Sequence, residues 1–305
     1  MAQIAVLLMA YGTPNSIEDI EPYLTDIRRG RKATPEAVLE LKNRYNKIGG
    51  KSPLLEITKA QALALERKLQ SENTDARVYF GMKHWHPYIR EVVPKIIYDG
   101  LKRVVGVALA PHYSQISIGG YRRAFDEANA GRLEADFVES WYDNPLFHAA
   151  IAEKIKEALT RFPDPEKVEL LFTAHSLPER ILEQNDPYPN QLQSSCKSVA
   201  EILKRERWSF AYQSAGMTGE KWLGPDILEF LGQLSRRNGL GGVLVVPIGF
   251  VADHLEILYD LDVEAKEYAR SLGLHLERTE SLNATPAFIA ALADIVQKRL
   301  KQNVR

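Results

Sequence analysis

The stretch LLFTAHSLP at residues 170–178 decides the fold when it is set beside LLMAYGTP at residues 7–14. Each is a short apolar run, typical of a buried strand, that leads into a turn ending in proline. When Leu8 is aligned with Phe172, Tyr11 falls opposite His175. This match indicates an internal repeat with one copy in each half of the chain.

Two further matches support the repeat. VESWYDNPLFHAAI at 138–151 resembles TESLNATPAFIAAL at 279–292, with Glu-Ser, Pro and Phe at the same relative positions before an Ala-rich helix. VALAPHYS at 107–114 resembles VVPIGFVAD at 245–253. The two halves of the chain are therefore expected to share one order of strands and helices.

Short apolar runs alternate with longer amphipathic runs along the chain. Runs such as VVGVALA and GVLVVP are apolar throughout, which is typical of parallel strands covered by helices on both faces. We expect strands at 4–9, 77–82, 104–110, 136–140, 168–173, 209–212, 242–247 and 275–279. We expect helices at 17–28, 35–46, 55–70, 87–101, 121–130, 146–161, 191–205, 227–238, 252–272 and 286–302.

These patterns predict an α/β fold of two similar Rossmann-like domains, each a four-stranded parallel sheet flanked by helices, with a cleft between them. Residues 1–143 with a C-terminal helix at 287–305 would form the first domain, and residues 144–286 the second. Such sheets bind ligands at the carboxyl ends of their strands. The site should therefore be built from AYGTP, KHWHP, APHYS, AHSLP, QSAG and PIGFVADH, with Tyr11 and His175 on opposite sides of the cleft.

Composition excludes several classes of function. The 39 Lys and Arg residues and 40 Asp and Glu residues leave a net charge of −1, which gives no overall field for binding a nucleic acid. The single cysteine, Cys196, allows no internal disulfide and by itself no iron–sulfur cluster, which favours a cytoplasmic protein. No apolar run reaches the ~18 residues of a membrane span. Neither a P-loop nor a GxGxxG fingerprint is present, which argues against a nucleotide-dependent enzyme.

Local charge is more informative than the total. A basic run extends from Arg28 to Lys32 and is followed by Arg44, whereas Glu256, Asp260 and Glu264 recur every four residues within the predicted helix 252–272. The basic run is either ordinary solvated surface or a site for carboxylates or phosphates. The acidic residues would lie on one face of an α-helix, with Asp253 and Glu267 close to it. They form either a solvated face or a series of oxygen ligands that binds a divalent cation or carries protons.

The chain resembles the ferrochelatase family over nearly its whole length. The segments that carry the resemblance are AYGTP, YLTDIRRGRK, RYNKIGGKSPL, GMKHWHP, LAPHYS, ESWYD, TAHSLPERI, DPYPNQL, YQSAG, KWLGPD and PIGFVADHLEILYDLD. The resemblance implies a chelatase fold and the insertion of Fe²⁺ into a porphyrin in heme biosynthesis. It implies no cofactor beyond the Fe²⁺ substrate and no iron–sulfur cluster.

The resemblance also assigns roles to individual residues. His175 and Glu256 match the residues of the metallation site. Tyr11 matches the tyrosine of Gram-positive, coproporphyrin-type members, where it lies on the opposite face of the ring and ligates the iron of the product, so coproporphyrin III is the expected substrate. Positions that contact the macrocycle and its propionates are Arg28, Arg44, Tyr45, Ser52 and Tyr121, and Lys83 and Trp222 match positions lining the cleft. Asp260 and Glu264 match an outer metal site, which would bind Mg²⁺ or another divalent ion.

A mechanism follows from the chemistry of the substrate. A metal reaches the pyrrole nitrogens of a flat porphyrin only when the ring is bent, which requires binding energy from remote propionates. His175 would accept a pyrrole proton or contact the metal first, and either role needs a neutral imidazole, so activity should fall at acidic pH. Glu256 would pass iron inward or relay the proton outward along Asp260 and Glu264. The sequence does not order these steps.

Three alternatives remain open at this stage. They are a protoporphyrin IX ferrochelatase, a non-catalytic heme or porphyrin carrier on the same fold, and a cobalt or nickel chelatase, because His and carboxylate ligands select poorly among divalent metals. The expected partners are coproporphyrin III and ferrous iron, with transient contact to an iron donor or a downstream enzyme of the heme pathway.

Overall fold

A computed structural model describes residues 3–216 and 219–302. It contains two four-stranded parallel sheets, ordered β2-β1-β3-β4 and β6-β5-β7-β8. The strands of the first sheet are β1 (Ile4–Ala10), β2 (Ala76–Met82), β3 (Arg103–Ala108) and β4 (Glu134–Val138). Those of the second are β5 (Val168–His175), β6 (Trp208–Gln213), β7 (Gly242–Val246) and β8 (Leu276–Arg278). The expectation of two equivalent parallel sheets is confirmed, and we call each sheet with its helices a lobe.

The strands are apolar throughout because helices cover both faces. On β1, Val6 and Leu8 face one core cluster, whereas Leu7 and Met9 face another. This alternation follows from the two-residue period of a strand. The helices are α1 (Ile20–Ile27), α2 (Pro35–Lys47), α3 (Leu54–Ser71), α4 (Ile89–Tyr98), α5 (Ile118–Asn129), α6 (Pro145–Leu159), α7 (Tyr188–Leu203), α8 (Ile227–Leu234), α9 (Lys266–Ser271) and α10 (Pro286–Gln302).

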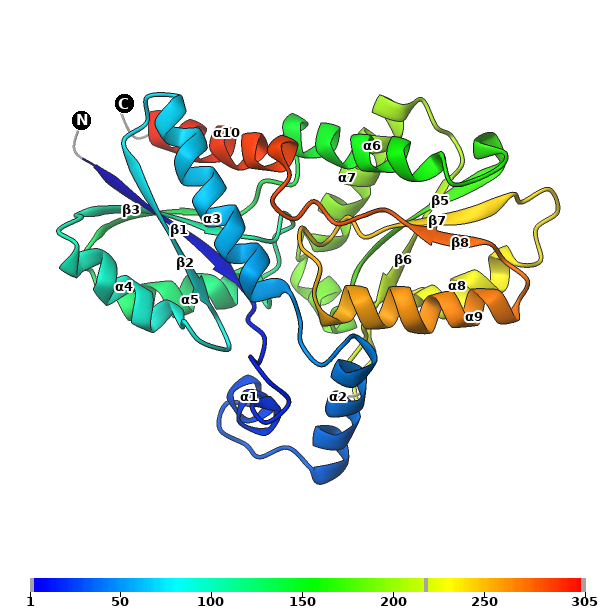
Figure 1. Ribbon diagram of the computed structural model, residues 1–305, viewed down its shortest axis with the longest axis horizontal. Coiled ribbons are helices and arrows are strands. Elements are labelled where there is room, and N and C mark those ends of the chain that lie inside the picture. Colours follow the sequence, from blue (N-terminus) through cyan, green and yellow to red (C-terminus); the bar gives the residue numbers. More distant parts are fainter. Residues whose placement is uncertain (1–2, 217–218, 303–305) are drawn as a thin grey trace.

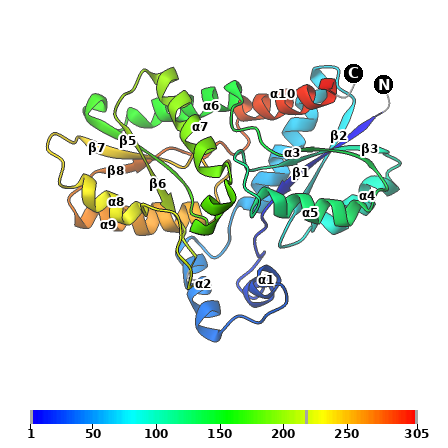
Figure 2. The ribbon, with the colours of Figure 1, turned by 180° about the vertical axis from the view of Figure 1, so that it is seen from behind.

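The helices that follow the last strand of each sheet cross to the other lobe. Helix α6 follows β4 but packs on α7 and β7, whereas α10 follows β8 but packs on α3 and β3 (Figure 1). In Figures 1 and 2, α10 and α6 lie end to end along one side of both sheets. The apolar residues under this layer form one core that spans both lobes. These contacts support the division into 1–143 with 287–305 and 144–286, which we retain as a proposal.

Helices α1 and α2 project from the first lobe, beyond the carboxyl end of β1 and beside the second lobe (Figure 1). Thr34 caps α2 by accepting a hydrogen bond from the backbone N–H of Ala37, and Pro35 occupies the first helical position. The basic run from Arg28 lies in the connection between the two helices.

The predicted α-helix at 252–272 is wrong in its type. A π-helix of nine residues, Ile257–Ala265, occupies the middle of this range, and α9 follows it directly. The core side of this segment is apolar at Ile257, Leu261, Ala265 and Ala269, one residue in every four. A spacing of four falls between the 3.6 residues of an α-helical turn and the wider turn of a π-helix. Two 3₁₀ helices, Pro165–Lys167 and Glu179–Gln184, had no counterpart among the expected elements.

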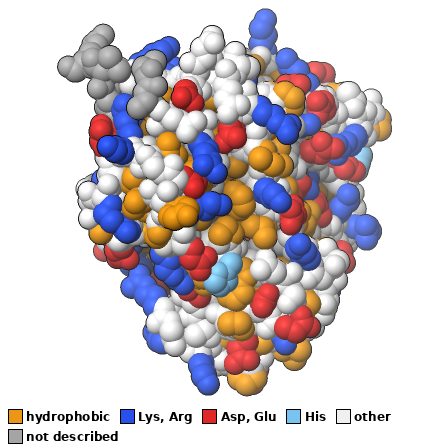
Figure 3. Space-filling view, turned by 60° about the vertical axis from the view of Figure 1, so that its left-hand side comes forward, with side chains coloured by type: hydrophobic (Ala, Val, Ile, Leu, Met, Phe, Trp, Pro, Cys, Tyr) orange, Lys and Arg blue, Asp and Glu red, His pale blue; other side chains and the backbone are white. Residues whose placement is uncertain are grey.

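Surface charge is mixed. In the view of Figure 3, basic and acidic side chains are interspersed around a central group of hydrophobic ones, as a net charge of −1 suggests. Within the described ranges, no helix is both long and apolar enough to cross a bilayer.

Candidate metallation site between the two lobes

Tyr11 and His175 lie at the carboxyl ends of the central strands β1 and β5, as the repeat predicts. Each strand end is held by a close backbone approach. Gly12 has φ of +103°, and a Cβ on it would lie 2.9 Å from the backbone nitrogen of Trp85. A Cβ on Gly249 would lie 2.6 Å from the Cβ of Ala174, the residue before His175. Side chains at these two glycines would therefore displace both strand ends.

The His175 imidazole has a defined orientation. Its Nδ1 lies within hydrogen-bonding distance of the carbonyl oxygen of Ser176, which only accepts, so Nδ1 carries the proton. In a neutral ring, Nε2 then carries the lone pair, and it lies 3.6 Å from Oε1 of Glu256. The Tyr188 hydroxyl donates to the His175 carbonyl at 2.9 Å and holds the backbone below the ring. The lone pair on Nε2 of His175 therefore faces the carboxylate of Glu256.

Glu256 is an ionised carboxylate between two histidines. Burial opposes its ionisation, but His175 and His254 outweigh burial and lower the pKa of Glu256 to about 2. His254 donates through Nδ1 to the Ala252 carbonyl at 2.9 Å, and its Nε2 lies 3.6 Å from Oε2 of Glu256. Burial lowers the pKa of His254, but Glu256 outweighs it, so this pKa lies above its usual value. The contact between His254 and Glu256 therefore favours the charged form of both side chains.

Asp260 follows Glu256 by one turn and differs from it in pKa. It is buried, accepts a hydrogen bond from Ser214, and lies 3.5 Å from Arg44. Burial, together with the negative charge of Glu256, raises the pKa of Asp260 to about 6. Asp260 can therefore gain and lose a proton near neutral pH, as a proton relay requires.

The proposed outer metal site is not preformed in the described residues. Glu264 is exposed on the π-helix beyond Asp260. In the part of the chain that the structure describes, no three His, Cys, Asp or Glu side chains lie close enough together to hold a metal ion. Asp253, which the sequence places close to the acidic face, binds Arg278 on β8 through its carboxylate.

The first lobe contributes two tyrosines and a lysine. Burial raises the pKa of Tyr11, with Glu256 and Asp26 adding to it, so the phenol stays protonated. Nζ of Lys83 lies 5.9 Å from the ring centroid of Tyr11 and 5.3 Å from that of Tyr121. These contacts bring three of the predicted residues together in the first lobe, where the charge of Glu256 also raises the pKa of both tyrosines.

The other predicted residues differ in their exposure and in their contacts. Arg44 on α2 contacts Glu40 at 2.9 Å and lies 5.0 Å from the ring of Tyr259. Tyr45 is buried, and its hydroxyl lies 2.7 Å from that of Thr13. Ser52 is fully buried and accepts from the backbone of Leu54 at 3.3 Å, whereas Arg28 is exposed after α1. The ring centroid of Trp222 lies 6.3 Å from that of His175.

Sequence reasoning missed three contributors to the site. Ser214, Tyr188 and Thr13 each orient a predicted residue through one hydrogen bond. Ser214 lies in the predicted QSAG segment and has φ of 58°, but a single serine in a turn carries no signal of its partner. Only the fold shows which carboxylate it meets.

Two four-stranded parallel sheets, with a paired histidine and carboxylate at the end of a central strand and a tyrosine at the end of the equivalent strand, are the arrangement of the chelatase class. Solved structures of this class have the same fold: SirB from Bacillus subtilis with Fe³⁺ (TM-score 0.62, 11% identity) covers 98% of this chain and 96% of its own. CbiX, described as the terminal enzyme for biosynthesis of siroheme in denitrifying bacteria, matches with a TM-score of 0.57 at 10% identity, covering 97% and 99%. At these identities the likeness concerns the fold.

The ferrochelatase family model matches residues 3–300, and the chain belongs to the ferrochelatase family. A ferrochelatase from Herpetosiphon aurantiacus is 50% identical over 301 residues, covering 97% of this chain and 98% of the relative. The coproporphyrin III ferrochelatase of Bacillus subtilis is 44% identical, covering 98% of each chain. The protein is therefore a ferrochelatase, an enzyme whose substrates are a porphyrin and iron.

Proposed function

We propose that the protein inserts Fe²⁺ into coproporphyrin III. The names of several relatives support this substrate, among them proteins from Bacillus subtilis and, at 42% identity, Oceanobacillus iheyensis. Coproporphyrin III has four carboxylates, whereas protoporphyrin IX has two. A cleft that prefers the former needs positive charge that the protein itself does not neutralise.

The first lobe supplies such charge. Lys83 is half-buried, and a Cβ placed on Gly120 would lie 2.5 Å from its Nζ and 3.9 Å from an Nη of Arg123. Burial, together with the positive charges of Arg123 and Arg29, lowers the pKa of Lys83 to about 8. Arg44, by contrast, already pairs with Glu40 and Asp260. The cations around Lys83 are the part of the cleft that best suits additional propionates.

The observation that carries the chemistry is the pair of His175 and Glu256, 3.6 Å apart, with Tyr11 close enough to Glu256 for its charge to raise the pKa of the phenol. The two lobes would bend the macrocycle between them, and the lone pair on Nε2 of His175 would accept a pyrrole proton. Glu256, held ionised by His254, would stabilise the imidazolium that forms. Asp260 would carry the proton onward, because its pKa of about 6 allows it to be protonated and released near neutral pH.

Tyr11 would ligate the iron of the product from the opposite face. Asp260 with exposed Glu264 would attract a hydrated divalent ion such as Mg²⁺ or incoming Fe²⁺. We retain a cytoplasmic location, the absence of any cofactor beyond substrate iron, and transient contact with an iron donor or a downstream enzyme as parts of the proposal.

An anaerobic absorbance assay tests the substrate. Fe²⁺ is supplied with coproporphyrin III or with protoporphyrin IX, and formation of the iron porphyrin is followed for each. We expect kcat/KM at least tenfold higher for coproporphyrin III. Equal or faster conversion of protoporphyrin IX would overturn the substrate assignment, and tight binding of iron porphyrin without any conversion would favour a carrier.

A further inference from the structure

One arginine holds the segment that carries the site carboxylates. Residues 253–264 contain five carboxylates, and two of them, Asp253 before the π-helix and Asp262 within it, bind the guanidinium of Arg278 on β8. Glu256 and Asp260 lie between these two points in sequence. The arginine is 13% exposed in its side chain, so the contacts are sheltered from solvent.

Most N–H donors of the Arg278 guanidinium have a hydrogen-bond partner. Nε and Nη2 of Arg278 donate to the two carboxylate oxygens of Asp262 at 2.8 and 2.7 Å, which is a bidentate pair. Nη1 donates to Oδ1 of Asp253 at 3.2 Å and to the carbonyl of Thr279 at 2.9 Å. A lysine has one point of charge and cannot make this bridge.

Both carboxylate oxygens of Asp253 accept further hydrogen bonds. Ser281 donates to its Oδ1 at 2.7 Å, and Asn283 donates to its Oδ2 at 2.9 Å. The backbone N–H of Asp253 donates to the Asn283 side chain at 2.9 Å. Gln61 on α3 donates to the Asn283 carbonyl at 2.8 Å, which connects this network to the first lobe. Asp253 is thus a fixed anchor for the chain that enters the π-helix.

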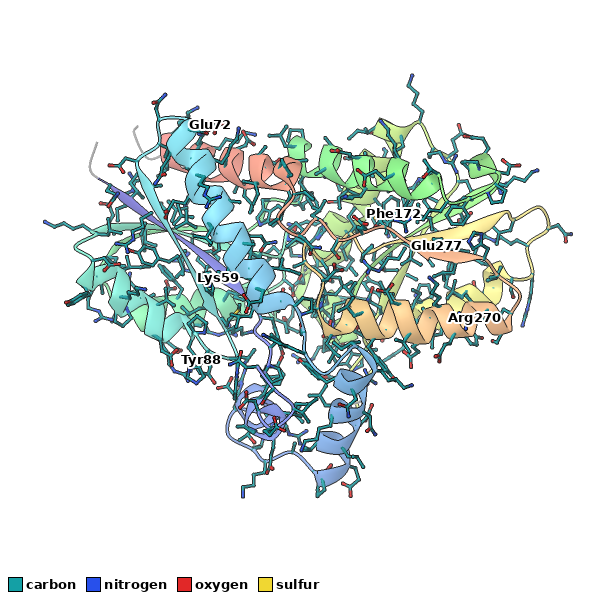
Figure 4. The ribbon with its side chains drawn as sticks, in the orientation of Figure 1. Lys59, Glu72, Tyr88, Phe172, Arg270 and Glu277 are labelled. Carbon is teal, nitrogen blue, oxygen red and sulfur yellow. The ribbon has the colours of Figure 1, made fainter. Side chains whose placement is uncertain are left out.

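A π-helix nine residues long needs such anchors, because this conformation is rare and most examples are single turns. Its apolar side packs into the core of the second lobe at Ile257 and Leu261. Polar contacts outside that core add to this packing in fixing the rotation of the segment about its axis. On β8, Leu276 and Arg278 flank Glu277 (labelled in Figure 4), so their side chains lie on the same face of the strand. Leu276 packs into the core that also contains Ile257 and Leu261.

We infer that Arg278 is a positioning residue for iron insertion: by binding Asp253 and Asp262 it sets the rotation of the π-helix that brings Glu256 to His175 and Asp260 to Arg44. It also divides the acidic residues into two groups. Asp253 and Asp262 are neutralised on the side of β8, which leaves Glu256, Asp260 and Glu264 for the cleft. This inference rests on the proposed role of Glu256.

The test uses Arg278→Lys, which keeps the charge but not the bridge, in the full-length enzyme. We expect at least a tenfold fall in kcat, a higher KM for Fe²⁺, and coproporphyrin III affinity, measured by fluorescence quenching, within about twofold of wild type. The matched control is Arg103→Lys in the other lobe, where Arg103 pairs with Asp136 at 3.0 Å. The control should lose no activity.

A mutant cycle separates positioning from a general loss of structure. If Arg278 acts through Glu256 and Asp260, adding Arg278→Lys to a variant that carries both Glu256→Gln and Asp260→Asn should slow the enzyme by less than twofold further. Independent, multiplying effects would overturn the inference, as would unchanged kcat in Arg278→Lys beside a slow Glu256→Gln. Full activity of Glu256→Gln would overturn the inference together with the proposed role of Glu256. If Arg278→Lys does not fold, Asp262→Asn, which removes one end of the bridge, enters the same cycle with the same expectations.

Discussion

Nη1 of Arg44, on α2, lies 3.5 Å from Oδ1 of Asp260, on the π-helix. The contact connects the projecting helix pair of the first lobe to the acidic residues of the second. It leaves Asp260 with a raised pKa all the same, because burial and Glu256 outweigh Arg44. Asp260, one of the carboxyl groups of the predicted proton path, therefore titrates near neutral pH.

This titration should appear in the stability of the protein. The pKa of Asp260 is about 6 in the folded state against an ordinary value of 3.8, so the folded state binds this proton more tightly. The contribution of Asp260 to stability is therefore present at low pH and is lost as the pH rises through 6. The variant Asp260→Asn lacks this titration. Its free energy of unfolding minus that of wild type should therefore rise by about 1 kcal/mol between pH 5 and pH 8. Urea unfolding at both pH values measures it, and a difference that does not change with pH would contradict the assignment.

Replacing His175 by Ala should abolish metallation without abolishing porphyrin binding. The imidazole supplies the lone pair that faces Glu256, and loss of a general base costs about 100-fold or more in kcat. Anaerobic Fe²⁺ insertion and fluorescence quenching measure the two properties separately. His275→Ala is the control, since this exposed histidine pairs with Glu277 at the far end of the second sheet. Normal turnover by His175→Ala would end the assignment.

Lys83→Gln should weaken coproporphyrin III binding about tenfold, or about 1.4 kcal/mol, because one charge-assisted contact to a propionate is lost. In wild type the same loss should develop above pH 8, where Lys83 gives up its proton. Titrations at pH 7 and pH 9 measure both effects. Arg122→Gln on α5 is the control, because Arg122 already pairs with Asp126 at 2.7 Å. Equal affinity in Lys83→Gln and wild type would remove Lys83 from the proposed carboxylate site.

The core shared by the two lobes should make their unfolding a single transition. Phe172 (labelled in Figure 4) is fully buried on β5 within the core cluster that also contains Val6, Leu8 and Phe288. Phe172→Ala should cost about 3–5 kcal/mol and lower the stability of both lobes together. Denaturant unfolding followed by tryptophan fluorescence and circular dichroism measures it, with exposed Lys59→Ala as the control. Two separate transitions would show that the lobes unfold independently.

The sequence was sufficient for the repeated fold and for the family. Apolar runs without alternation require helices on both faces of each sheet, and a duplicated strand-to-turn motif places Tyr11 and His175 at equivalent strand ends. These are short-range patterns, and each is complete within about ten residues. The same locality explains why the helix at 252–272 was assigned the wrong type, since a spacing of four residues suits two helix types almost equally.

Tertiary structure alone decided which charges meet. The sequence places Asp253, Glu256, Asp260 and Asp262 within ten residues, but not which of them face the cleft. That choice depends on Arg278, Arg44 and two histidines, which reach the segment from other elements. A pKa depends on burial and on neighbouring charges, and both arise only when distant parts of the chain pack together. The sequence therefore determined which residues could do the chemistry, and the packing of the two lobes determined the charge that each one carries.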